Sequence, residues 1–204
     1  HKTNVIIQCR FGSTRLPGKA LFPLCGTTLL GFLIKRLKAA LSPENYRIIV
    51  ATTEKSEDDP ITAWADHEGV CAIRGSEDDV LTRYIQVLQE VPSDLNVRVT
   101  GDNPLTCPEI LQQCVELAQR KHLDYVQAID FPYGSGMDVF SGSLLEQLDK
   151  QASSNQDREH INDYVLKNPG KFAVEYFKAS PPLNRPGVRV TVDTPYDFEK
   201  ITFF

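Results

Sequence analysis

The 204-residue sequence lacks the patterns that define membrane, secreted and zinc-binding proteins. No apolar run approaches the ~20 residues that span a bilayer, and the first apolar stretch, residues 5–7, is too short for the core of a signal peptide. The five cysteines are scattered without CxxC spacing, so we expect reduced, mostly buried thiols. We therefore expect a soluble, cytoplasmic protein that does not bind membranes.

Extended basic stretches are also missing. The chain has 22 Lys and Arg against 27 Asp and Glu, a formal net charge of -5. Such a chain is poorly suited to the nucleic-acid backbone, so we expect no nucleic-acid partner. The patterns GxxxxGK(S/T) and GxGxxG are absent too, which disfavours an adenine-type P-loop and a dinucleotide fold.

Short β-rich runs alternate with amphipathic stretches along the chain. We expect helices at residues 27–40, 143–151 and 157–167, and a last strand at residues 188–192. This alternation predicts an α/β protein with a mainly parallel, doubly wound sheet in three layers, folded as a single domain over residues 1–204. In such a sheet, ligands bind at the carboxyl ends of the strands.

A basic segment, RFGSTRLPGK at residues 10–19, directly follows the first predicted strand and contains three cations and no acid. Arginine binds phosphate oxygens through a bidentate fork, and lysine binds them as a point charge. As an exposed loop residue, Lys19 is expected to contribute little packing. The alternative is a solvated loop that is basic by chance. The candidate phosphate-binding residues are Arg10, Gly12, Ser13, Arg15 and Lys19.

Two aspartates also follow predicted strands. Asp102 follows the strand at residues 97–99, and Asp193 follows the last strand. With the basic segment at the same sheet edge, both carboxylates are candidate metal ligands. Each has an alternative structural role, because Asp102 could cap the helix near Pro108 or fill a turn, and Asp193 could cap the helix that follows it.

The second half of the chain offers candidates for binding a second substrate. Tyr133, Gly134 and Asp138 lie in the loop best placed for that contact, although an irregular surface loop is the alternative. Arg158 and His160 fall inside a predicted amphipathic helix, where a solvated face is as consistent with the pattern as a ligand contact.

Six segments taken together resemble a known family: QCRFGSTRLPGKAL, RGSEDDVLTRY, VTGDNPL, GMDVF, REHI and RVTVDTPYDFEKI. They look like the spore-coat-polysaccharide type of cytidylyltransferase, which is related to CMP-sialate and CMP-Kdo synthetases. The resemblance runs from residue 5 to about residue 201. It implies a Rossmann-like nucleotide-diphospho-sugar-transferase fold. It also implies a homodimer that transfers CMP from CTP to an acidic or amino sugar-type acceptor, releasing pyrophosphate, in bacterial surface polysaccharide or glycoconjugate biosynthesis.

The resemblance also implies roles for individual residues. Arg10, Lys19, Asp102 and Asp193 form the catalytic set, the two aspartates bind the Mg²⁺ cofactor, and Arg74 and Ser76 lie near the cytosine. Cys9 stands where alanine is usual, and Thr82 stands where an acid is often found. The implied nucleotide-binding residues are Arg10, Gly12, Ser13, Arg15, Lys19, Arg74, Ser76, Gly101 and Asp102. The implied acceptor-binding residues are Pro104, Tyr133, Gly134, Asp138, Arg158 and His160.

Two other functions stay open. One is a non-catalytic protein that binds a nucleotide or sugar phosphate, although the presence of all four catalytic residues speaks against it. The other is a metal-dependent glycosyltransferase of similar fold. Those enzymes usually present two aspartates as DxD at a strand end, whereas Asp102-Asn103-Pro104 offers one.

Overall fold

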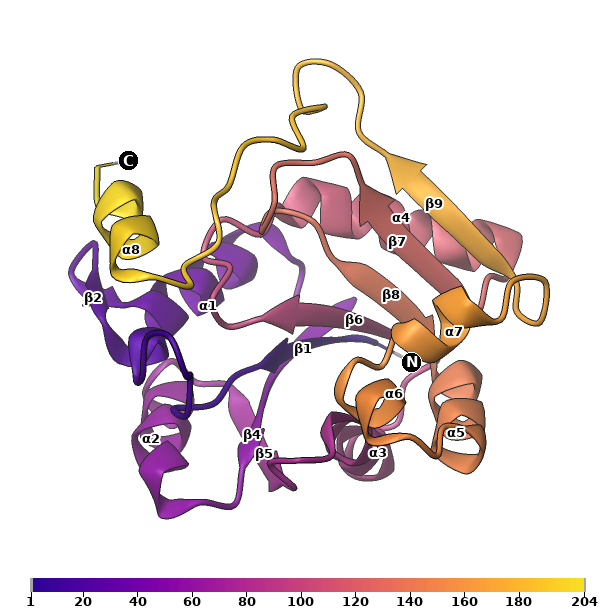
Figure 1. Ribbon diagram of the computed structural model, residues 1–204, viewed down its shortest axis with the longest axis horizontal. Helices are drawn as coiled ribbons and strands as arrows, with labels where there is room; N and C mark the ends of the chain where they lie inside the picture. Colours follow the sequence, from indigo (N-terminus) through magenta and orange to yellow (C-terminus); the bar gives the residue numbers. More distant parts are fainter. Residues whose placement is uncertain (1, 204) are drawn as a thin grey trace.

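The computed structural model of the protein describes residues 2–203 and contains a seven-stranded sheet (Figure 1). Its strands are β1 (Thr3–Gln8), β4 (Tyr46–Thr53), β5 (Cys71–Gly75), β6 (Leu95–Thr100), β7 (Tyr125–Ile129), β8 (Asp138–Ser141) and β9 (Val174–Lys178). Their order is β5-β4-β1-β6-β8-β7-β9, and β8 alone runs antiparallel to its two neighbours. A separate hairpin joins β2 (Pro23–Leu24) and β3 (Thr27–Thr28). The predicted mainly parallel α/β sheet is confirmed.

Helices cover both faces of this sheet (Figure 1). They are α1 (Leu29–Ala40), α2 (Asp59–His67), α3 (Val80–Glu90), α4 (Pro108–Lys121), α5 (Gly142–Gln151), α6 (Asn155–Glu159), α7 (Asp163–Lys167) and α8 (Pro195–Ile201). Because successive side chains of a strand point to opposite faces, Val5 and Ile7 of β1 pack with α1, α2 and α4, whereas Ile6 packs with α3 and α5. The result is the predicted three-layer arrangement.

The first helix begins later than the sequence predicts. Thr27 and Thr28 were cap candidates for a helix predicted over residues 27–40, and both lie in β3, so α1 starts at Leu29. Thr28 is the N-cap, and its side-chain oxygen accepts a hydrogen bond of 3.0 Å from the Gly31 amide. Threonine is favoured at this position because its oxygen satisfies an amide that has no partner within the helix.

The predictions for the second half were less accurate. The predicted helix over residues 157–167 is two short helices, α6 and α7, and the buried Ile161 lies between them. The segment at residues 188–192 is not a strand, although Val190 and Val192 are buried. Its backbone instead bonds to two loops, since Val190 N donates to Tyr133 O and Val192 N donates to Asp102 O. Val190, Thr191 and Val192 are buried in succession, so the sequence located a buried segment but not its backbone partner.

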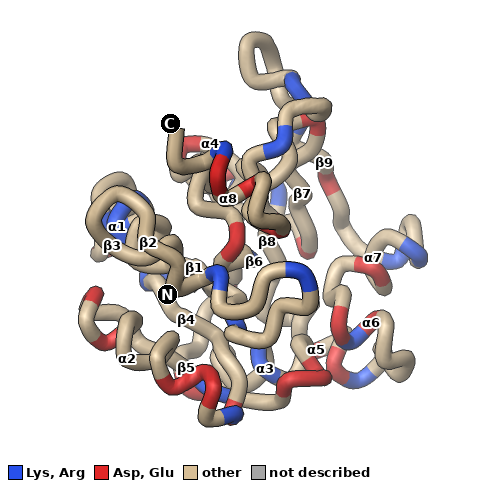
Figure 2. The backbone as a smooth tube through the Cα atoms, turned by 60° about the vertical axis from the view of Figure 1, so that its left-hand side comes forward, with Lys and Arg blue, Asp and Glu red and all other residues tan. Residues whose placement is uncertain are grey.

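Basic and acidic positions are interspersed over the backbone (Figure 2). All five cysteines are free, but only Cys9 and Cys114 are buried, so the expectation of mostly buried thiols was wrong. Within residues 2–203, no helix combines the length and apolar content needed to cross a membrane.

Candidate active site

The site lies where β1 and β6 run side by side. From β1 the chain passes through α1 to β4 on one side, and from β5 it returns through α3 to β6 on the other. Ligands of open α/β sheets bind at such a switch point, beyond the carboxyl ends of the strands. The two strand ends approach closely at Gly101, where a Cβ atom would lie 2.8 Å from Cys9 Sγ. A larger residue at Gly101 would push the loop after β6 away from the basic loop.

The C-terminal segment packs against the basic loop from a third direction. Leu16 of the loop, Val192 and Ile201 of α8 share one buried apolar cluster. The rings of Phe22 and Phe198 meet edge to face at 5.1 Å in the same region. This packing places Asp193, which follows Val192, beside a loop that precedes it by more than 170 residues.

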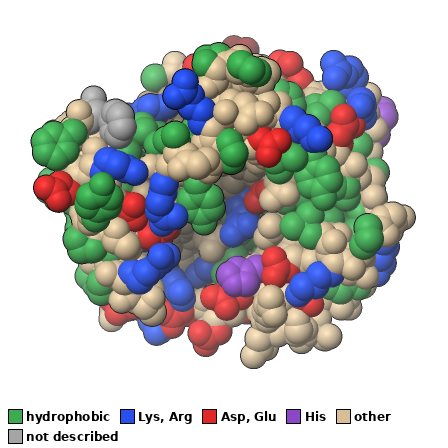
Figure 3. All heavy atoms as spheres, turned by 45° about the horizontal axis from the view of Figure 1, so that its top comes forward, with side chains coloured by type: hydrophobic (Ala, Val, Ile, Leu, Met, Phe, Trp, Pro, Cys, Tyr) green, Lys and Arg blue, Asp and Glu red, His purple; other side chains and the backbone are tan. Residues whose placement is uncertain are grey.

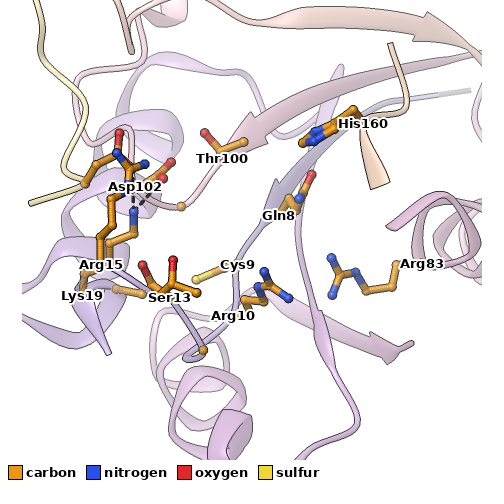
Figure 4. Close-up of a pocket in the computed structure, with 15 residues that line it drawn as sticks. Gln8, Cys9, Arg10, Ser13, Arg15, Lys19, Arg83, Thr100, Asp102 and His160 are labelled. Atoms are coloured by element: carbon orange, nitrogen blue, oxygen red, sulfur yellow. Dashed lines mark hydrogen bonds and ion pairs between the residues drawn. The ribbon is translucent and has the colours of Figure 1, made fainter. Parts of the chain in front are cut away.

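Lys19 points toward Asp102 at one side of the site (Figure 4). Its Nζ donates to Asp102 Oδ2 at 2.8 Å, to Asp193 Oδ1 at 3.0 Å and to the carbonyl oxygen of Val192 at 2.8 Å. The two predicted metal ligands therefore converge on one positive group. The side chain of Lys19 is only 11% exposed, so it is not the exposed loop lysine expected from the sequence.

Neither aspartate caps a helix, which excludes that alternative role. The N-cap of α4 is Cys107, and the N-cap of α8 is Thr194, which forms a capping box with Asp197. Burial opposes ionisation of Asp193. The hydrogen bond and charge of Lys19, together with the charges of Arg15 and Arg189, outweigh burial and lower the pKa of Asp193. Asp193 is therefore a carboxylate at neutral pH.

The remaining basic-loop cations also face carboxylates. Arg10 lies 3.6 Å from Glu77 Oε1, and Arg15 lies 3.3 Å from Asp193 Oδ1. Together with Lys19, every cation of residues 10–19 thus has an anionic neighbour. This arrangement is complementary to a polyanion, which can replace the carboxylates as the partner of these cations.

A buried carboxylate fixes the start of the basic loop. Asp58, which is 1% exposed, accepts hydrogen bonds from Phe11 N at 2.6 Å and from Thr53 N at 3.1 Å. The Thr53 hydroxyl donates to it as well. Asp58 therefore holds the loop after β1 against the end of β4.

Two cavities adjoin at Asp102 and Asp193, the two carboxylates that contact Lys19. The first, of about 350 Å³, is lined by the basic loop and the end of β6. The second, of about 680 Å³, is lined by β7, β8 and the loop between them. A space-filling view of one face shows a hollow with basic side chains in and around it and a histidine at its edge (Figure 3). The residues that line both cavities are Arg15, Thr100, Asp102, His160 and Asp193.

The structure brings most of the predicted site residues to these cavities. Arg10, Gly12, Ser13, Lys19 and Gly101 line the first. Tyr133, Gly134, Asp138 and His160 line the second. Gly134 has φ +99° and approaches Thr191 so closely that a Cβ would lie 2.6 Å from its amide nitrogen. The loop that carries Tyr133 is thereby held against the C-terminal segment.

Four predicted contact residues lie outside the lining of both cavities: Arg74, Ser76, Pro104 and Arg158. Arg74 donates to the carbonyl oxygens of Thr53 and Lys55 and to Asp59. Arg158 donates to Asp79 at 2.5 Å and to Asp149 at 2.9 Å. These guanidinium groups link elements of the fold. That Arg74 and Arg158 also contact a substrate stays a prediction.

His160 is not part of a helix, contrary to the sequence-based expectation. It follows the last residue of α6 and lines both cavities. Asp138 is on β8 and accepts a hydrogen bond of 2.8 Å from the Tyr125 hydroxyl, with Arg98 Nη1 at 3.4 Å from its other oxygen. Burial raises the pKa of Asp138, and Arg98 only partly offsets this effect.

Sequence reasoning missed several residues that line the cavities. Gln8, Arg83 and Thr100 line the first, and Arg98, Gln127 and Asn162 line the second. Gln8, Arg98 and Thr100 are at or near the ends of β1 and β6, where the switch-point rule could have found them. Arg83 is in α3 and carried no such signal.

Known proteins share both the sequence and the fold. A sequence profile described as cytidylyltransferase matches residues 4–203. The chain is 40% identical over 194 residues to an uncharacterized protein of Methanocaldococcus jannaschii, covering 95% of this chain and 79% of that protein. It is 35% identical over 199 residues to spore coat polysaccharide biosynthesis protein SpsF of Bacillus subtilis, covering 96% and 83% of the two chains.

Comparison with solved structures agrees with the sequence comparison. A cytidylyltransferase from Leptospira borgpetersenii is 36% identical, with a TM-score of 0.90 over 98% of this chain and 85% of that one. A CMP:2-keto-3-deoxy-manno-octonic acid synthetase complexed with CTP is 18% identical, with a TM-score of 0.75 over 100% and 98% of the two chains, and shows the shared fold. The fold is that of the Rossmann-like nucleotidyltransferases. The chain belongs to the cytidylyltransferase family, and it is a CTP-dependent enzyme.

Proposed function

We propose that the protein transfers CMP from CTP to a hydroxyl group of a sugar-type acceptor and releases pyrophosphate. The observation that supports this most strongly is the position of Asp102 and Asp193 in the wall between two adjoining cavities. A nucleotide in the first cavity and an acceptor in the second would meet at these carboxylates. Phosphoryl-type transfer depends mainly on such positioning and on charge stabilisation.

The triphosphate of CTP occupies the first cavity in this proposal. Arg10 and Lys19 bind its oxygens, with Arg15, the Ser13 hydroxyl and the backbone at Gly12 as further partners. Arg10, Arg15 and Lys19 are held in place by the neighbouring carboxylates, which supports their use as preorganised partners of the phosphates.

Asp102 and Asp193 hold the metal ion in this proposal. The three oxygens around Lys19 Nζ, from Asp102, Asp193 and the Val192 carbonyl, form a cradle that already accepts a cation. This donor set fits Mg²⁺, which prefers oxygen ligands and is often bound by one or two carboxylates plus substrate phosphates. When bound, the ion neutralises charge on the phosphate group that reacts. Lys19 is then free to contact the phosphates.

The acceptor occupies the second cavity, where Tyr133, Gly134, Asp138 and His160 line the wall. Its hydroxyl attacks the α-phosphorus in line with the departing pyrophosphate. The chain's tasks are to orient the two substrates and stabilise the charge that develops. We propose an acidic or amino sugar as acceptor. A similar protein at 24% identity is a 3-deoxy-manno-octulosonate cytidylyltransferase of Idiomarina loihiensis, which supports a sugar acid. The spore coat relative supports a role in surface polysaccharide biosynthesis.

Pyrophosphate release tests the reaction. The protein is incubated with CTP and Mg²⁺, alone and with members of a panel of sugar acids and amino sugars. We expect release that depends on one acceptor, together with a CMP-linked product detectable by mass spectrometry. Release without any acceptor would indicate hydrolysis instead. CTP binding without release across the panel would favour the non-catalytic alternative.

We also propose a homodimer formed by the segment after residue 130. This segment exposes large apolar side chains, which often mark association surfaces when they cluster. They are Tyr133, Leu166, Tyr176, Leu183, Val188, Tyr196 and Phe203. Light scattering of the purified protein tests the proposal, and a monomer mass at micromolar concentration would contradict it.

A further inference from the structure

Arg83 is a buried cation on the wall of the first cavity (Figure 4). It belongs to the first turn of α3, and only 2% of the residue is exposed. Its stem packs against the end of β5, where a Cβ at Gly75 would lie 3.1 Å from Arg83 Cγ. The absence of a side chain at Gly75 therefore leaves room for this arginine.

Arg83 lacks the partners that a buried guanidinium normally has. Nε and Nη1 are buried and have no hydrogen-bond partner within residues 2–203. A nearby carboxylate, Asp58, already accepts hydrogen bonds from Phe11 and Thr53. The other cations that line the cavity, Arg10, Arg15 and Lys19, each face a carboxylate within 3.6 Å. Arg83 differs from these three cations, because it forms no ion pair with a carboxylate within residues 2–203.

Burying the guanidinium group of Arg83 without hydrogen-bond partners costs free energy. Taking a charged group out of water is strongly unfavourable unless a counter-charge and hydrogen bonds compensate for the lost hydration. Burial lowers the pKa of Arg83, and the positive charge of Arg10 contributes in the same direction. The guanidinium groups of Arg10 and Arg83 point toward each other in the cavity (Figure 4). Two neighbouring cations without an intervening anion repel each other.

We propose that Arg83 binds a phosphate group of the nucleotide, and of the pyrophosphate product, jointly with Arg10. This inference rests on the proposed use of CTP and adds a fourth cation to the site. An oxyanion between the two guanidinium groups would provide the missing counter-charge. A neutral pyrimidine ring could accept hydrogen bonds from Arg83 but could not cancel the charge. The electrostatic requirement therefore favours phosphate over the base.

Arg83→Met tests the inference, because methionine keeps an unbranched apolar stem and removes the charge. The matched control is Arg120→Met, which removes an exposed arginine at the end of α4. Arg83→Lys is the second variant, since it keeps the charge but not the guanidinium fork. Isothermal titration calorimetry then measures binding of pyrophosphate, CTP and cytidine in Mg²⁺-containing buffer. Thermal unfolding without ligand measures the structural role.

We expect Arg83→Met to bind pyrophosphate and CTP roughly 10- to 100-fold more weakly, the usual range for losing hydrogen bonds to a charged group. Cytidine binding should be unchanged, and Arg120→Met should bind all three as the wild type does. The unliganded melting temperature should not fall, because replacing an unpaired buried charge with an apolar group is often neutral or stabilising. Arg83→Lys should lose less affinity than Arg83→Met.

Other results would overturn the inference. Unchanged pyrophosphate affinity in Arg83→Met would show that Arg83 does not bind phosphate. Equal losses for cytidine and CTP would place Arg83 at the base instead. If Arg83→Met does not fold, wild-type pyrophosphate affinity in a folded Arg83→Lys would also contradict a specific guanidinium contact. If wild-type protein binds neither CTP nor pyrophosphate, the proposed function fails before the role of Arg83 is tested.

Discussion

Lys19 and Asp102 are 83 residues apart in the sequence and are joined by a salt bridge of 2.8 Å between Nζ and Oδ2. The same ammonium group bonds Asp193 Oδ1 at 3.0 Å. One cation thus joins the loop after β1, the loop after β6 and the C-terminal segment. Lys19 therefore holds these three segments together and is also a candidate phosphate-binding residue.

The first prediction concerns Lys19→Ala. Removing a preorganised electrostatic group from an active site typically costs roughly 100- to 1000-fold in rate, and we expect a loss of this order in CTP turnover. The change also leaves Asp102 and Asp193 facing each other without the ammonium. The melting temperature without metal should therefore fall, and Mg²⁺ should raise it more than in the wild type. A normal turnover rate, or a Mg²⁺ response equal to that of the wild type, would contradict this role.

The second prediction concerns the two aspartates. Asp102→Asn and Asp193→Asn should each reduce kcat roughly 100- to 1000-fold, because an amide is a poor substitute for a carboxylate metal ligand. Asp66→Asn is the control, since Asp66 is exposed on α2. Steady-state kinetics over a Mg²⁺ titration gives the measurement. Full activity of one Asn variant would remove that residue from the mechanism, and undiminished activity in excess EDTA would remove the metal.

The third prediction concerns the base. CTP should be used in preference to UTP, because the exocyclic amine of cytosine donates a hydrogen bond where uracil presents an acceptor. A site that pairs such a group discriminates strongly against the analogue that lacks it. Comparison of kcat/KM for CTP, UTP, ATP and GTP is the measurement. Equal values for CTP and UTP would show that the base pocket does not recognise this amine.

The fourth prediction concerns Asp58, which anchors the basic loop through Phe11 N. Asp58→Asn replaces an acceptor oxygen with a donor amide, and leaving buried groups unsatisfied costs about 1–3 kcal/mol. This corresponds to a fall of roughly 2–4 °C in Tm per kcal/mol for a chain of this size. KM for CTP should rise as the loop loses its anchor. The adjacent Asp59→Asn is the matched control, because the Asp59 side chain is 61% exposed. Equal effects at both positions would contradict the anchoring role.

The fifth prediction concerns acid stability and Asp197. Burial opposes ionisation of Asp197, but hydrogen bonds from the Asp193 and Thr194 amides and from Arg189 outweigh burial and lower its pKa. A carboxyl whose pKa is lower in the folded state contributes stability above its unfolded pKa of about 4. That contribution is lost as the pH falls through the folded pKa. Asp197→Asn should therefore lower Tm at pH 7 but reduce the further loss between pH 5 and pH 3. Parallel Tm curves for the two proteins would contradict this linkage.

Some of the site followed from the sequence alone. The run of cations at residues 10–19 and Asp102 each come after a strand, so both were expected at the same edge of a parallel sheet. Asp193 follows a segment that was predicted to be a strand and is not one, and it reaches the site because the C-terminal segment packs against the basic loop. The structure confirms the alternation, and Lys19 contacts both aspartates.

Other features could not be found this way. The interval between β7 and α7 departs from the alternation of strands and helices, so β8 was not predicted, Asp138 was expected in a loop and His160 was expected in a helix. Arg158 was a candidate for acceptor contact, but its hydrogen bonds to Asp79 and Asp149 depend on where α6 packs. These contacts depend on long-range packing, which cannot be predicted from a local sequence pattern.

The chain's own sequence determined the fold class and the chemical character of the site. The alternation of β-rich and amphipathic segments, and the residues that follow each predicted strand, are local properties of the sequence. Tertiary structure alone decided the electrostatic state of the individual groups. Lys19 looks like a solvated loop residue until Asp102 and Asp193 are placed around it, and Arg83 looks like an ordinary surface residue of an amphipathic helix. Only the packing of α3 beside β4 and β5 removes Arg83 from water, because hydration and counter-charge depend on neighbours that are distant in the sequence.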